Sequence, residues 1–93
     1  LYPFEEYSTK SDILKIIEMI DIGGPSLLRA ASKNFDYITP IMFIEDYDKL
    51  INNIKVNNGV TDIKFRRMMA SKVFEETSKY DKLIAKWFNE NKE

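Results

Sequence analysis

The chain has 93 residues, enough for one domain at most, and a domain of this size buries roughly 60 to 65% of the surface that its unfolded form exposes. Its 44% hydrophobic and 31% charged residues are typical of a folded chain, and a net charge of −1 argues against non-specific nucleic-acid binding. The absence of cysteine and histidine excludes disulfides, thiolate chemistry, the usual zinc ligands and Ser-His pairings, which leaves Lys, Tyr, Asp or Glu to move protons.

The first half of the chain predicts two helices that meet at a glycine turn. Ser11 is a suitable N-cap for a helix whose apolar residues recur with helical spacing, at Ile13, Ile16, Ile17 and Ile20. Gly23-Gly24 is predicted to stop this helix. Pro25 is predicted to take the first position of the next one, which ends near Lys33-Asn34.

The second half predicts a short strand and two further helices. Tyr37 to Phe43 is rich in β-branched and aromatic residues, although Pro40 restricts it to an edge or a shortened strand. Asp46 to Ile54 has helical spacing and is closed by Asn57-Asn58-Gly59. From Thr61, the predicted N-cap, one long helix carries apolar or packing residues at Phe65, Met69, Val73, Thr77, Tyr80, Ile84 and Trp87. The chain itself is therefore predicted to be mostly α with one or two short strands.

The turn Asp21-Ile22-Gly23-Gly24-Pro25 is the stretch in which chemistry is concentrated. A glycine pair lets the main chain approach a ligand closely, and the free N–H groups of a helix start, with its dipole, favour an anion or a developing oxyanion. Asp21 is the nearest ionisable group. The alternative is that Gly-Gly-Pro only ends one helix and begins another, and the pattern taken alone favours that alternative.

Two further residues allow both a functional and a structural interpretation. Lys33 near a helix C-terminus is favoured by the helix dipole alone. Tyr2 can present a phenol at the end of the extended segment Leu1 to Phe4 or can be a core contact. The aromatic residues of the long helix and its Met68 and Met69 are interpreted as packing residues without chemistry.

Several segments, in this order, resemble one enzyme family. They are Leu1 to Glu6, Ile20 to Asn34, Asp46 to Asp48, Ala70 to Phe74 and Thr77 to Asp81. The chain resembles the bifunctional purine-biosynthesis enzymes that combine phosphoribosylaminoimidazolecarboxamide (AICAR) formyltransferase with IMP cyclohydrolase. Residues 1–93 would be the C-terminal part of the cyclohydrolase domain, with the formyltransferase domain absent.

The resemblance implies an α/β domain of the methylglyoxal-synthase-like (MGS-like) fold, a parallel sheet with flanking helices. It implies a multifunctional enzyme, both hydrolase and transferase, that closes the formamido-imidazole-carboxamide ribotide to IMP with loss of water. The cyclohydrolase step needs no metal or cofactor, whereas 10-formyltetrahydrofolate serves the missing formyltransferase domain. The family also implies a cytoplasmic homodimer with a purine ribotide as substrate, and neither nucleic acid nor membrane as partner.

Carried over residue by residue, Asp21, Lys33 and Tyr2 match catalytic residues of the family. Ile22, Gly23 and Gly24 match main chain that binds the substrate base. Under this hypothesis Lys33 or Tyr2 stabilises the oxygen of the tetrahedral intermediate, and Asp21 orients the substrate or relays a proton.

A straight helix from Pro25 would place Asp21 and Lys33 more than roughly 10 Å apart. Either the substrate spans the gap, the helix ends early so that Lys33 turns back, or another chain contributes.

Two departures from the family pattern leave a second function open. Phe35 and Glu76 stand where the family usually has histidines. The isolated chain is predicted not to cyclise, because the family's phosphate-binding loops precede this segment. The alternative is a non-catalytic helical interaction module with a decayed site, which packs on a partner through the apolar faces around Ile17 and Trp87.

Overall fold

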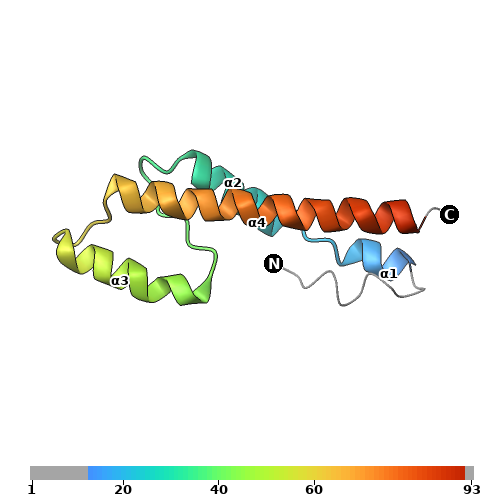
Figure 1. Cartoon of the computed structure of the whole chain (residues 1–93), viewed down its shortest axis with the longest axis horizontal. Coiled ribbons are helices and arrows are strands. Elements are labelled where there is room, and N and C mark those ends of the chain that lie inside the picture. The colour runs from blue at the N-terminus through green and yellow to red at the C-terminus, as the bar shows by residue number, and fades with distance from the viewer. Residues whose placement is uncertain (1–12, 92–93) are drawn as a thin grey trace.

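A long C-terminal helix forms the spine of the molecule. The computed structural model describes the backbone of residues 13–91 and, from Lys15 on, their side chains. Within that range the elements are α1 (Ile13–Glu18), α2 (Gly23–Lys33), the 3-10 helix η2 (Ile44–Asp46), α3 (Tyr47–Val56) and α4 (Ile63–Glu90). Figure 1 shows α1, α2 and α3 arranged along α4 rather than around a closed centre. The described body measures 55 × 21 × 16 Å, and its radius of gyration of 16.4 Å exceeds the about 12 Å of a compact chain of this length.

One stripe of α4 carries most of the buried surface. Its buried side chains are Phe65, Met69, Ala70, Val73, Thr77, Tyr80 and Trp87. Their spacing of three or four residues places them on one face of the helix. The predicted long helix and its packing stripe are confirmed, although Met68 is half exposed and Ile84 only partly buried. The N-cap is Asp62 and not Thr61, because Asp62 Oδ1 accepts a hydrogen bond of 2.7 Å from the Phe65 N–H.

The predicted helix pair before Lys33 is present, with a different junction. The first helix already ends at Glu18, so Gly23-Gly24 does not stop it. The second begins at Gly23, which makes Pro25 its third residue rather than its first. The predicted end near Lys33-Asn34 is confirmed. Ser11, the predicted cap of the first helix, lies outside the described residues.

The turn Asn57-Asn58-Gly59 closes α3 as predicted. Asn58 has φ +58° and Gly59 has φ +93°, conformations that asparagine and glycine tolerate better than other residues. Behind this turn the side chains of Asn53 and Asn57 donate to Asp62 Oδ2 at 3.1 and 3.3 Å. The same carboxylate therefore caps α4 and ties it to the end of α3.

The predicted strand Tyr37 to Phe43 is wrong for the described part of the chain, in which no strand forms. A strand is stabilised by ladder hydrogen bonds to a neighbour, and residues 13–91 offer this segment none. Instead Tyr37 and Ile38 donate back to the carbonyl of Asn34, each at 3.1 Å. The structure is mostly helical, so the parallel sheet of the expected α/β fold stays a prediction.

The surface proposed for a partner-binding module is only half available. Trp87 is 1% exposed and packs in a cluster with Ile16 and Tyr80, whereas Ile17 is 40% exposed. The indole would become available to a partner only if α1, which carries Ile16, moved away from α4. The partner-binding alternative therefore stays a prediction, and in the described structure Trp87 itself is not part of an exposed face.

Candidate functional site

The carboxylate of Asp21 is held at the first turn of α2. Its Oδ1 accepts a hydrogen bond of 3.0 Å from the Gly24 N–H, which satisfies one donor of the helix start. Gly24 permits this approach, because a Cβ at that position would lie 2.7 Å from Asp21 Oδ2 and 3.2 Å from Oδ1. The second glycine of the pair is thus explained by the close carboxylate and not by a positive φ angle.

The main chain of Asp21 is held by a residue of α4 that lies far along the sequence. Its N–H donates to the hydroxyl of Tyr80 at 2.9 Å, across 59 positions. Tyr80 is 5% exposed and belongs to the buried cluster with Ile16 and Trp87. Asp21 lies between α1 and α2, and in the described structure its N–H finds its acceptor on α4. Tyr80 is the residue that the sequence interpretation missed, since a periodic aromatic on α4 was assigned to packing alone.

The main chain at the start of α2 is less open to an external anion than the sequence suggested. The Gly24 N–H is bound to Asp21, the Ser26 N–H donates to the Ile22 carbonyl at 3.1 Å, and Pro25 has no N–H. The chain's own carboxylate therefore occupies the position expected for an anionic ligand. Ile22, Gly23 and Gly24 are exposed, so a ligand can still reach their main chain.

Lys33 lies at the opposite end of the same helix. Because α2 is continuous from Gly23 to Lys33, its 11 residues span about 16 Å. The proposal that the helix ends early and turns Lys33 back is therefore wrong. The structure brings Asp21, Gly24 and Tyr80 together, and it does not bring Lys33 to them.

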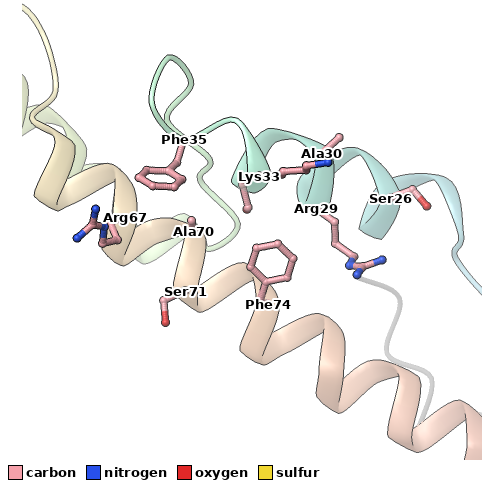
Figure 2. A pocket seen from close by; sticks show the side chains of 10 residues that line it. Ser26, Arg29, Ala30, Lys33, Phe35, Arg67, Ala70, Ser71 and Phe74 are labelled. Atoms are coloured by element: carbon pink, nitrogen blue, oxygen red, sulfur yellow. The ribbon is translucent and has the colours of Figure 1, made fainter.

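Lys33 instead borders an open groove of about 680 Å³ between α2 and α4. The groove is lined by three cations, two aromatic rings and small residues: Arg29, Lys33, Arg67, Phe35, Phe74, Ser26, Ser32, Ser71, Ala30 and Ala70. Figure 2 shows the Arg29 guanidinium and the Phe74 ring extending into the space between the helices. The guanidinium carbon of Arg29 is 5.8 Å from the centre of the Phe74 ring, and that of Arg67 is 5.6 Å from the centre of the Phe35 ring. Both distances are those of cation–π contacts.

The two positions that depart from the family pattern have separate environments. The Phe35 carbonyl accepts a hydrogen bond of 2.7 Å from Arg66 Nε, which anchors the chain just after α2. Glu76 is partly buried on α4 and does not line the groove. The side chains at these two positions therefore do not form one cluster in the described structure. Tyr2, the third predicted catalytic residue, lies outside the described residues.

A buried ion pair joins the start of α3 to α4. Asp46 is 1% exposed, and its Oδ1 accepts a hydrogen bond of 2.8 Å from Lys72 Nζ, with Lys49 Nζ at 3.6 Å. The hydrogen bond from Lys72, aided by the charges of Lys72 and Lys49, lowers the pKa of Asp46 although burial opposes this. The same hydrogen bond raises the pKa of Lys72. The pair fixes the position of η2 and α3 and lies outside the groove lining.

Residues 13–91 contain neither a cluster of metal-binding side chains nor a membrane-spanning helix. No three acidic side chains in this range gather closely enough to hold a metal ion. Among the helices described, none is both long enough and apolar enough to cross a membrane.

Comparison with known proteins relates the chain to one family. A sequence model of the AICARFT/IMPCHase bienzyme family matches residues 31–93. The bifunctional purine biosynthesis protein PurH of Staphylococcus carnosus (strain TM300) is 48% identical over 95 residues, which cover 100% of this chain and 19% of that protein. PurH of Leuconostoc mesenteroides subsp. mesenteroides is 45% identical, over 97% of this chain and 18% of its own length. PurH of Bartonella bacilliformis is 42% identical over 100% of this chain. The chain spans about a fifth of the length of the curated relatives that it matches.

Proposed function

The chain belongs to the AICARFT/IMPCHase bienzyme family, and we propose that it supplies part of the site at which an IMP cyclohydrolase closes the purine ring. The observation that supports this most is the Asp21 turn. A carboxylate is fixed there through its main chain and its side chain, beside the exposed backbone of Ile22 and Gly23. The substrate would be the formamido-imidazole-carboxamide ribotide and the product IMP.

The ring closure is an addition to the formyl group followed by loss of water. The carboxamide nitrogen attacks the formyl carbon, the carbonyl oxygen becomes the oxygen of a tetrahedral intermediate, and that oxygen leaves as water. The carboxamide nitrogen and the formamido nitrogen each lose one proton, and the formyl oxygen gains both before it leaves as water, so atoms and charge balance. A site for this reaction needs an aligned substrate, a donor for the oxygen that gains charge, and groups that move the two protons.

Asp21 and Lys33 have suitable chemistry for these demands. A carboxylate accepts hydrogen bonds, so Asp21 would hold the attacking amide and accept or relay its proton. The Lys33 ammonium would donate to the developing oxyanion or to the departing hydroxyl. Only one oxygen of Asp21 is committed to the Gly24 N–H in the described structure, which leaves Oδ2 to a substrate.

The length of α2 restricts how the two groups share one reaction. Its ends are about 16 Å apart, and the side chain of Lys33 is long and exposed. Either the ribotide extends from the Asp21 turn towards Lys33, or Lys33 of a second chain approaches the Asp21 turn. Mixing the full-length variants Asp21→Asn and Lys33→Ala distinguishes these arrangements, because only a shared site recovers activity in mixed dimers.

The test of the proposed function is the cyclisation rate of the full-length protein with Asp21→Asn or with Lys33→Ala. We expect each change to lower kcat by at least about a hundredfold, which is the usual contribution of a general acid or base. Asp48→Asn and Lys55→Ala change exposed residues of the same types on α3 and are expected to leave kcat unchanged. Normal turnover in both site variants would exclude the proposed function.

A further inference from the structure

The hydrogen bond between the Asp21 N–H and the Tyr80 hydroxyl, 2.9 Å long, joins residues 59 positions apart. It joins the turn before α2 to the middle of α4, and in a purely packing role Tyr80 would not need its hydroxyl. We propose that Tyr80 is a positioning residue for the ring-closing reaction, which sets the orientation of the Asp21 carboxylate through the main chain. This inference rests on the proposed function.

The side chain of Tyr80 is held rigidly by the core. It is 5% exposed and lies in a cluster with Ile16 and Trp87, with Ile20 and Leu83 packed against the cluster. A tyrosine has only two side-chain torsions, and close packing restricts both. The hydroxyl oxygen is therefore held in place by the core, and not by the turn that it contacts.

Hydrogen bonds hold both the main chain and the carboxylate of Asp21. Asp21 lies outside both helices, so Tyr80 provides the acceptor that its N–H would otherwise lack in this segment. The carboxylate of Asp21 is held in turn by the Gly24 N–H, at 3.0 Å. Two hydrogen bonds, one on each side of Cα, thus restrict the backbone and the side chain of the same residue.

The Asp21 carboxylate has little room to move. A Cβ at position 24 would lie 2.7 Å from Asp21 Oδ2, so the carboxylate has room only because residue 24 is glycine. Catalytic groups must be held within fractions of an ångström of the productive geometry. A shift of the Asp21 main chain would therefore lower the rate of the chemical step more than it would weaken substrate binding.

The experiment is a double-mutant cycle in the full-length protein with Tyr80→Phe and Asp21→Asn, read as kcat and KM of cyclisation. Tyr80→Phe keeps the ring and removes only the hydroxyl, and we expect kcat to fall about tenfold or more with KM within about threefold. In the Asp21→Asn background the same change should have almost no further effect, because Tyr80 acts through Asp21. Tyr37→Phe is the matched control, since Tyr37 is 86% exposed and far from these contacts in the sequence.

A second variant tests whether the orientation of the Asp21 carboxylate limits the rate, without changing α4. Gly24→Ala places a methyl group against the Asp21 carboxylate and at the same time favours the helical conformation. We expect it to lower kcat about tenfold while the protein remains folded, an outcome that a merely structural role of the turn does not predict.

Three outcomes would overturn the inference. The first is a kcat within twofold of wild type for Tyr80→Phe, while Asp21→Asn loses activity. The second is an equal, additive loss from Tyr80→Phe in both backgrounds, which would mean that the hydroxyl acts on the fold alone. The third is full activity of Asp21→Asn, which together with full activity of Lys33→Ala would also exclude the proposed function, whereas the first two would leave it intact.

Discussion

The two ends of α2 differ in how the side chains of Asp21 and Lys33 are held. At the N-terminal end, Asp21 is fixed by hydrogen bonds to Tyr80 and Gly24, and Tyr80 is part of the buried cluster. At the C-terminal end, Lys33 is exposed at the edge of a groove whose rings, Phe35 and Phe74, are themselves partly or largely exposed. Hydrogen bonds within the chain therefore hold Asp21 in position before any ligand binds. Lys33 instead presents a long side chain that can adapt its conformation.

The rigid attachment of Asp21 and the exposed side chain of Lys33 suit the two residues to different roles in the proposed reaction. A group that must be aligned with a reacting atom benefits from a rigid attachment, because its geometry is then set before substrate arrives. A cation that stabilises charge over a longer range can act from a flexible stem. Under the proposed function, the rigid attachment suits Asp21 to the aligned proton transfer, and the flexible stem suits Lys33 to charge stabilisation at the reacting oxygen.

The largest expected effect concerns the cluster under the Asp21 end. Trp87→Ala should lower the free energy of unfolding by about 3 to 5 kcal/mol, since it removes a side chain that is 1% exposed. Phe74→Ala, at the Lys33 end, removes a ring that is 42% exposed and should cost less than about 1.5 kcal/mol. Urea unfolding of the two variants measures the contrast, and equal losses would contradict it.

The next prediction concerns the ion pair that anchors η2 and α3 on the side of the molecule nearer Lys33. The Lys72 hydrogen bond holds the pKa of Asp46 below its ordinary value of 3.8, so the pair stabilises the fold above about pH 4. This stability is lost as the pH falls through the lowered pKa. The pKa of Lys72 is raised above 10.5, so its contribution is lost only as the pH rises beyond that value.

Asp46→Asn should therefore lower the Tm by several degrees at neutral pH, because it leaves Lys72 without its carboxylate. The difference from wild type should be constant between about pH 5 and 9 and should shrink below about pH 4, first as the carboxylate of the unfolded chain takes up its proton and then as the pH reaches the lowered pKa of the folded protein. Thermal unfolding across this range is the measurement. A difference that persists unchanged at pH 3 would show that charge is not the cause.

A smaller effect compares the two ends of α2 directly. Asp21→Ala removes the acceptor for the Gly24 N–H and should cost about 1 kcal/mol of folding stability, the usual value of a helix cap. Lys33→Ala should change stability by less than about 0.5 kcal/mol, because Lys33 is exposed. Both variants should lose cyclisation activity, so only the stabilities separate the two ends. Equal stabilities, measured by denaturant unfolding, would mean that Asp21 is not a cap.

Periodicity predicted the helical parts of the fold because it reports a buried face directly. The buried stripe of α4 from Phe65 to Trp87 and the end of α2 at Lys33 were both predicted from the sequence. The strand at Tyr37 to Phe43 was predicted wrongly, since β-branched and aromatic residues state a preference but supply no partner strand. The start of α2 was misplaced because Pro25 marks an early helical position without saying which one.

The candidate site was readable only in part. The turn at Asp21 was identified from its glycines and from family resemblance, together with Lys33. The role of Tyr80 could not be predicted, because its hydroxyl meets a main-chain N–H 59 positions away and a helical pattern does not distinguish that contact from packing. The pattern also suggested free N–H groups at the start of α2, whereas Asp21 itself binds one of them.

The most direct test of the account is hydrogen exchange of the full-length protein, with and without IMP. We expect the amides of Asp21 and Gly24 to exchange more slowly than those of Phe35 and Asp36, because hydrogen bonds to the Tyr80 hydroxyl and the Asp21 carboxylate protect the first two. We also expect IMP to add most protection at residues 21–24. Exchange at Asp21 and Gly24 as fast as at Phe35 and Asp36, and unchanged by IMP, would contradict the account.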